Sequence, residues 1–151
     1  MKMLVILNIS DSDKHFAPAI EEYSKRLGKS LHIENIKPCK GDTPPLIIKK
    51  ETELLIEILL KKYASYEKFL LSKEGKSLDT LELSASINHK DCIFIVWGPY
   101  GIERDMMVQS IPGLKEIAFG KITLPHGLAK LTLLEQLYRC YTITIWKTYH
   151  Y

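Results

Sequence analysis

Two short segments combine glycine and proline in patterns that could hold a ligand. The first, residues 98–101, reads Gly-Pro-Tyr-Gly and directly follows an apolar run. Glycines permit positive φ and a close approach of backbone to ligand, although a tight turn is the more common reason for so short a motif. The segment lacks the G-x-G-x-x-G pattern of dinucleotide-binding folds and the lysine of a P-loop. Chemistry on nucleoside triphosphates is therefore poorly supported.

The second segment, residues 120–127, reads Gly-Lys-Ile-Thr-Leu-Pro-His-Gly and stands just before a long helical pattern. Pro125 restricts the chain, and backbone amides at the helix start could face a carboxylate. The alternative is an ordinary start of a helix. Lys130 follows within the first turns, where the helix dipole disfavours a cation, so its amine either serves function or points to solvent.

The chain ends on Tyr149-His150-Tyr151, with a histidine between two tyrosines. A histidine has an ordinary pKa of ~6.5, so it can exchange a proton near neutral pH. Terminal residues are usually frayed and dispensable, however. The tail by itself therefore gives little evidence of function.

Strand and helix patterns alternate along the chain and must position these segments. Apolar or alternating runs predict strands over residues 3–9, 31–36, 69–71, 92–97 and 114–119. Helical spacing predicts helices over residues 16–27, 46–63, 103–111 and 128–146. Residues 38–45 predict a loop, residues 73–76 a turn, and Asp79 with Glu82 a capping box that starts a further helix.

This alternation predicts one α/β domain over residues 1–151 with a mostly parallel sheet. Ligands of such folds bind beyond the carboxyl ends of the strands. Leu71, residues 98–101 and residues 120–125 all follow predicted strands. Each is therefore a candidate binding loop.

Composition narrows the function only mildly. The net charge of +3 neither proves nor opposes a nucleic-acid partner. Cys39, Cys92 and Cys140 are far apart and form no C-x-x-C pair, so neither a disulfide framework nor a metal site is expected. Reduced thiols fit a cytoplasmic protein. No apolar run approaches the ~18 residues of a membrane span.

Taken together, these segments resemble the ribosomal RNA large-subunit methyltransferase H family of the SPOUT superfamily. The matching segments are residues 93–102, 121–126 and 134–139 with the terminal Tyr149-His150. Residues 1–2, 22–23, 25–27 and 75–76 agree in the N-terminal half. The resemblance spans the whole chain, and its T-L-P-H, L-E-Q-L-Y-R and Y-H segments are together highly specific.

The resemblance implies a trefoil-knotted α/β fold, S-adenosylmethionine as cofactor, and a homodimer with each active site at the subunit interface. It implies methylation of N3 of a pseudouridine in helix 69 of 23S ribosomal RNA, on the assembled ribosome. The transferred methyl group leaves a sulfonium, which is already a good electrophile, so no metal is required.

The resemblance also implies site residues. The cofactor pocket is expected to involve Leu71, Gly98, Gly120, Lys121, Ile122, Thr123, Leu124 and Pro125. The catalytic, RNA-facing side is expected to include His126, Lys130, Tyr149 and His150. Of these, His150 is the candidate general base for the uracil N3 proton, and Lys130 the candidate cation beside the uracil anion.

Four positions depart from the family pattern. Trp97 replaces a glycine, Tyr100 a polar residue, Lys130 an arginine and Tyr151 a basic residue. An indole at position 97 could crowd the cofactor or cover its adenine. Three alternatives therefore stay open: a cofactor- or ribosome-binding relative that has lost catalysis, a SPOUT methyltransferase with another RNA substrate, and, remotely, a flavodoxin-like nucleotide-binding module.

Overall fold

The chain folds around one parallel sheet. The computed structural model describes residues 2–10 and 14–150, so the expectations for Met1 and Tyr151 lie outside it. Five strands follow the spatial order β2-β1-β4-β3-β5, and every neighbouring pair is parallel. The strands are β1 (Leu4–Ile9), β2 (Leu31–Ile36), β3 (Glu67–Ser77), β4 (Cys92–Val96) and β5 (Lys115–Ala118). The predicted α/β class with a parallel sheet is confirmed.

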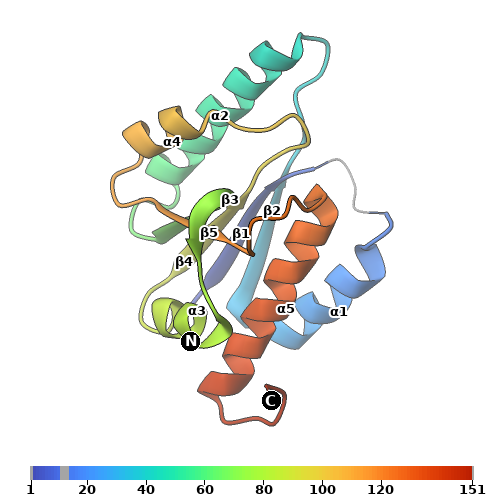
Figure 1. Ribbon diagram of the computed structural model, residues 1–151, viewed down its shortest axis with the longest axis vertical. Helices are drawn as coiled ribbons and strands as arrows, with labels where there is room; N and C mark the ends of the chain where they lie inside the picture. The colour runs from blue at the N-terminus through green and yellow to red at the C-terminus, as the bar shows by residue number, and fades with distance from the viewer. Residues whose placement is uncertain (1, 11–13, 151) are drawn as a thin grey trace.

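Helices cover both faces of the sheet (Figure 1). They are α1 (Ala17–Leu27), α2 (Pro44–Lys61), α3 (Thr80–Ile87), α4 (Arg104–Ser110) and α5 (His126–Thr144), with a 3-10 turn at Gly28–Ser30. Helices α1, α3 and α5 share one face and contact one another through α5, whereas α2 and α4 pair on the other face. The structure is a three-layer sandwich.

The central strands are apolar without interruption because both of their faces are buried. In β1, Leu4 and Ile6 pack with the α1, α3 and α5 side chains, while Val5 and Leu7 pack with those of α2. β4 alternates in the same way. This double burial explains why the sequence shows continuous runs there instead of polar alternation.

Capping residues and prolines in the sequence determine where helices α2 and α3 begin. The side chain of Asp79 accepts a hydrogen bond from the Glu82 amide, and the Glu82 carboxylate accepts one from the Asp79 amide, which confirms the capping box. Helix α2 starts at Pro44, two residues before the predicted start, because proline is well suited to the first turn. Cys39, Cys92 and Cys140 are all free thiols, as expected.

The predicted turn at residues 73–76 is wrong. β3 continues to Ser77, and its pairing with β5 shifts so that both Leu71 and Lys76 lie opposite Ile117. Residues 72–75 bulge out between these two pairings. Gly75 permits this, because a Cβ there would lie 2.6 Å from backbone atoms of Glu116 and Ile117. The residues that suggested a turn therefore form a bulge inside β3.

Helix α5 ends earlier than predicted, at Thr144, in a Schellman motif. The amide of Trp146 donates to the Ile143 carbonyl (3.3 Å) and that of Lys147 to the Thr142 carbonyl (2.9 Å). Trp146 adopts φ 58° at the position where glycine is usual. The tail then turns back along α5 (Figure 1). The trefoil knot implied by the resemblance stays a prediction.

Candidate functional site

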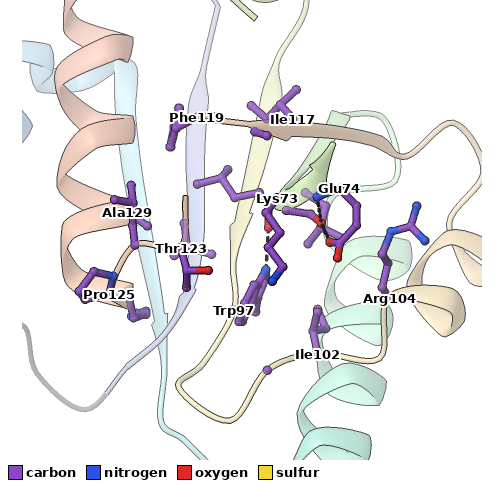
Figure 2. A pocket seen from close by; sticks show the side chains of 18 of the residues that line it. Lys73, Glu74, Trp97, Ile102, Arg104, Ile117, Phe119, Thr123, Pro125 and Ala129 are labelled. Carbon is purple, nitrogen blue, oxygen red and sulfur yellow. Dashed lines mark hydrogen bonds between the residues drawn. The ribbon is translucent and has the colours of Figure 1, made fainter. Parts of the chain in front are cut away.

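A cavity of about 690 Å³ opens at the carboxyl edge of the sheet. Its walls come from the ends of β3, β4 and β5 and from the first turn of α5 (Figure 2). The three candidate loops, around Leu71, at residues 98–101 and at residues 120–125, all line it. Parallel strands bring these loops together because their carboxyl ends meet at one edge.

The loop after β4 is both a tight turn and a wall of the cavity. The Gly101 amide donates to the Gly98 carbonyl (3.1 Å), and Gly101 itself has φ 106°. A Cβ on Gly98 would lie 3.1 Å from both Glu51 Oε1 and Ile9 Cγ2. Gly98 thus packs closely against Glu51 of α2 and Ile9 of β1, which leave little room for a side chain.

The loop after β5 forms the opposite wall. Gly120 has φ 98°, which favours glycine, and turns the chain toward α5. Among the residues that follow, those lining the cavity are Ile122, Thr123, Leu124 and Pro125. Lys121 is exposed and is not part of the lining. All predicted cofactor residues except Lys121 therefore border the cavity.

Trp97 directly follows β4, and its side chain reaches the backbone of β3. Its Nε1–H donates a hydrogen bond to the Leu71 carbonyl at 2.6 Å, drawn as a dashed line in Figure 2. Backbone pairing of β3 with β4 ends one step earlier, at Leu70 opposite Ile95. The indole therefore joins the two strands where their ladder stops.

One rim of the cavity is charged. Arg104 of α4 forms a bidentate pair with Glu116 of β5, with N–O distances of 2.5 and 2.8 Å. Glu74 accepts a hydrogen bond from Ser72 Oγ at 2.8 Å, and this bond lowers the pKa of the Glu74 carboxyl. The other walls are mostly apolar. Small-molecule sites usually have this form, a mostly apolar cavity with a few polar groups.

His126 and Lys130 differ in placement although one helical turn separates them. His126 is the first residue of α5 and lines the cavity. Lys130 is only 3% exposed and does not line it. Its Nζ lies 3.5 Å from Oδ1 of Asn35, which also accepts a hydrogen bond from Asn8 Nδ2 at 2.8 Å. The alternative that Lys130 simply points to solvent is therefore wrong.

The C-terminal tail lies away from the cavity of its own chain. The Tyr149 hydroxyl is 3.2 Å from both the Tyr23 hydroxyl and a Glu135 oxygen, and its ring meets Tyr138 edge-on at 4.8 Å. Burial and the Tyr23 hydrogen bond raise the pKa of Tyr149. His150 Nδ1 lies 3.5 Å from Arg139 Nη1.

The separation between the tail and the cavity follows from the geometry of α5. Glu135 is nine residues beyond His126 on α5, so the Tyr149 contact is roughly 13 Å along the helix from the cavity-lining histidine, at about 1.5 Å per residue. One chain therefore does not bring Tyr149 and His150 together with His126.

Sequence reasoning predicted helix α2 but missed two polar residues on it that support the loops. Glu51 and Thr52 of α2 are 2% and 0% exposed. Glu51 Oε2 accepts a hydrogen bond from the Cys39 amide at 2.9 Å, and Thr52 Oγ1 accepts one from the Glu103 amide at 3.1 Å. The available signal was spacing, because Glu51 lies four residues before Leu55 and so shares its buried face.

Two further features concern metals and membranes. Across residues 2–10 and 14–150, no group of three or more His, Cys, Asp or Glu side chains could hold a metal ion. None of the described helices is both long and apolar enough to cross a membrane.

The chain is similar to known methyltransferases in family, sequence and fold. A family model described as predicted SPOUT methyltransferase matches residues 1–150. Ribosomal RNA large subunit methyltransferase H from Mesomycoplasma hyopneumoniae strain J is 30% identical over 135 residues, covering 85% of this chain and 87% of the relative. The proteins of that name from strains 232 and 7448 are equally similar.

Two solved structures share the fold. One is a ribosomal RNA small subunit methyltransferase E from Neisseria gonorrhoeae bound to S-adenosyl methionine, with a TM-score of 0.58 and 16% identity over 92% of this chain and 66% of that chain. The other is a putative RNA methyltransferase from Bacillus anthracis, with a TM-score of 0.55 and 16% identity over 93% and 94%. The chain belongs to the SPOUT methyltransferases, within the ribosomal RNA large subunit methyltransferase H family.

Proposed function

We propose that this protein transfers a methyl group from S-adenosylmethionine to N3 of a pseudouridine in helix 69 of 23S ribosomal RNA, in the cytoplasm. The observation that carries the proposal is the single cavity in which three separate loops and His126 converge. The family supports the reaction class. The N3 position and helix 69 come from the family resemblance of the sequence.

The cavity suits the proposed cofactor. Its volume of about 690 Å³ is within the range of small-molecule sites, ~300–1,000 Å³. Leu71, Gly98 and residues 122–125 offer backbone groups and apolar surface for a nucleoside, whereas Lys121 is left out of this set. When bound, the cofactor supplies a methyl group activated by its sulfonium.

The chain must orient the uracil ring and remove its N3 proton, because only the deprotonated nitrogen is a strong nucleophile. Leu71, Gly98 and residues 122–125 would hold the cofactor, which would supply the methyl group that replaces the N3 proton. His126 borders the cavity. We place it on the RNA-binding side.

The proposed general base, His150, requires a second subunit. In one chain, Tyr149 and His150 pack against α1 and α5, away from the cavity. We propose that a homodimer completes each site by bringing the tail of one subunit to the cavity of the other. The site is therefore a joint product of two chains.

The decisive experiment is a methylation assay on ribosomes from cells that lack the gene. Purified protein and S-adenosylmethionine are added to these ribosomes, and the ribosomal RNA is digested and analysed by mass spectrometry. We expect one N3-methylpseudouridine in the helix 69 fragment. A methyl group elsewhere would establish a different RNA substrate. Cofactor binding without methylation would establish a relative that has lost catalysis.

A further inference from the structure

We propose that Trp97 is a specificity-determining residue of the cavity. Its N–H group fixes the Leu71 carbonyl, and its ring forms the wall against which the purine base of a nucleoside ligand packs. The inference deepens the proposed function and rests on it for the identity of the ligand.

The backbone determines which way the indole points. Along β4, Ile93 and Ile95 pack toward the α2 and α4 side of the sheet. Trp97 continues this alternation and packs against the same apolar cluster, as does Ile102. The ring is half-buried and also lines the cavity. One part of it is therefore held by the core while another part faces the ligand space, across from Thr123 and Pro125 (Figure 2).

The hydrogen bond to Leu71 locks that orientation. β3 leaves β4 after Leu70 and enters the bulge at residues 72–75, so the two strands separate at the cavity. The 2.6 Å bond from Trp97 Nε1 spans this gap. The indole has no other donor and no acceptor among its side-chain atoms, so its single polar group is already used.

A flat apolar wall is what remains for the ligand. Such a wall complements the face of a heteroaromatic base, since aromatic groups stack favourably in offset arrangements. It offers no hydrogen-bonding group to a ribose, an amine or a carboxylate. The polar parts of the ligand must therefore meet other groups, such as the loop backbone or the charged rim with Glu74 and Arg104.

The chain provides its own control. Its two tryptophans are Trp97 and Trp146. Trp146 is 95% exposed beyond the end of α5 and is not part of the cavity lining. In the full-length protein, Trp146→Phe leaves Trp97 as the only indole fluorophore, and Trp97→Phe leaves Trp146. Each protein is titrated with S-adenosylhomocysteine, adenosine or methionine, and calorimetry measures the same binding independently.

We expect S-adenosylhomocysteine and adenosine to change the fluorescence emission of the Trp146→Phe protein until it saturates. The Kd from this titration is expected to equal the Kd measured by calorimetry. Methionine alone is expected to leave the emission unchanged. The Trp97→Phe protein shows how much of any change in the wild-type emission comes from Trp146. By calorimetry, Trp97→Ala is expected to weaken S-adenosylhomocysteine binding by about 2- to 12-fold, the range of an aromatic pair. Trp97→Phe is expected to lose less, because the ring is kept.

Unchanged emission of the Trp146→Phe protein during a titration in which calorimetry reports binding would overturn the proposal. A Trp97→Ala protein that is folded and binds as tightly as wild type would do the same. The fluorescence test leaves position 97 intact, so it decides even where Trp97→Ala fails to fold. A wild-type protein that binds none of the nucleoside probes would instead overturn the proposed function.

Discussion

At the scale of single residues, Trp146 stands out for its backbone. Among the described residues other than glycine, it alone has a positive φ, and its side chain is 95% exposed. A left-handed conformation costs an L-residue with a Cβ roughly 1–2 kcal/mol. The indole offsets none of this by burial. The Schellman hydrogen bonds of Trp146 and Lys147 hold the conformation in place.

We therefore expect Trp146→Gly to raise the free energy of unfolding by about 0.5–1 kcal/mol, because the gain at positive φ is partly offset by the larger freedom of glycine in the unfolded chain. Urea denaturation measures the change. Trp146→Ala is the matched control, since it keeps the Cβ and removes the indole. Equal stability of the two variants would show that strain at Trp146 is negligible.

Lys130 is a buried amine close to the cavity-lining turn of α5. At 3% exposure, with Nζ 3.5 Å from Asn35 Oδ1, its position is set by the protein interior. We expect Lys130→Ala to lower the methylation rate at saturating ribosomes at least about tenfold. The family resemblance implies a cation at this position that stabilises the uracil anion, although Lys130 does not line the cavity of its own chain. Lys130→Arg, which keeps the charge, is expected to retain activity.

The measurement must separate chemistry from folding. Cofactor affinity and the thermal unfolding midpoint are determined for both Lys130 variants. If Lys130→Ala methylates at the wild-type rate, the amine has no catalytic role. If Lys130→Ala instead loses cofactor affinity and stability together with rate, its role is structural.

At the scale of elements, the pairing of β3 with β5 depends on Gly75. A Cβ there would lie 2.6 Å from backbone atoms, which cannot move as a side-chain end can. At Gly98, by contrast, a Cβ would lie 3.1 Å from the Glu51 and Ile9 side chains. Both glycines are near the cavity, but of the two only Gly75 would bring an added Cβ against backbone atoms.

We expect Gly75→Ala to destabilise the fold by about 1–3 kcal/mol, the usual cost of overpacking, and to weaken nucleoside binding by displacing the bulge. Gly98→Ala is expected to cost less, because side chains can yield by a few tenths of an ångström. Denaturant titrations of the two variants give the comparison. A larger loss for Gly98→Ala than for Gly75→Ala would contradict this account of the β3–β5 pairing.

Helix α5 illustrates how an apolar stripe can be used within one chain. Its buried residues include Leu133, Leu134 and Leu137, which pack into the core with α1 and α3. Leu134, Leu137 and Tyr138 of this helix thus serve the chain's own core. The apolar side chains of α5 therefore give no argument for a dimer. The stronger argument is the position of the tail, which lies away from the cavity of its own chain.

At the scale of the whole molecule, the proposed homodimer makes a specific prediction about shared sites. Removal of residues 149–151 is expected to abolish methylation while cofactor binding and the fold are retained. Ala129→Trp is expected to fill the cavity of its own subunit, because Ala129 lines it. Neither variant should be active as a homodimer. Light scattering of wild type is expected to give the mass of a dimer.

Coexpression of the two variants tests whether a site combines two chains. In a mixed dimer, the truncated subunit supplies an intact cavity and the Ala129→Trp subunit supplies an intact tail, so one of two sites is complete. With random pairing of a symmetric dimer, half of the molecules are mixed, which gives about a quarter of wild-type activity. No recovery of activity would place cavity and tail in the same chain.

The sequence by itself determined most of what depends on near neighbours. Strand and helix positions, the capping box at Asp79 and Glu82, and the parallel sheet all follow from periodicity over a few residues. The cavity loops followed from the strand pattern, because Leu71, Gly98 and residues 120–125 come after strands whose carboxyl ends meet at one edge. The family resemblance added which residues of these loops are expected to bind the cofactor. Those loops could therefore be predicted from the sequence.

Only the tertiary structure decided which partner each side chain meets. The turn predicted at residues 73–76 became a bulge because β5, some 40 residues later, pairs on both sides of it. Trp97 met Leu71, 26 residues away, and Lys130 met Asn35, 95 residues away. These contacts depend on strand order and on the direction of each side chain. Both arise when distant segments pack, and a local pattern encodes neither.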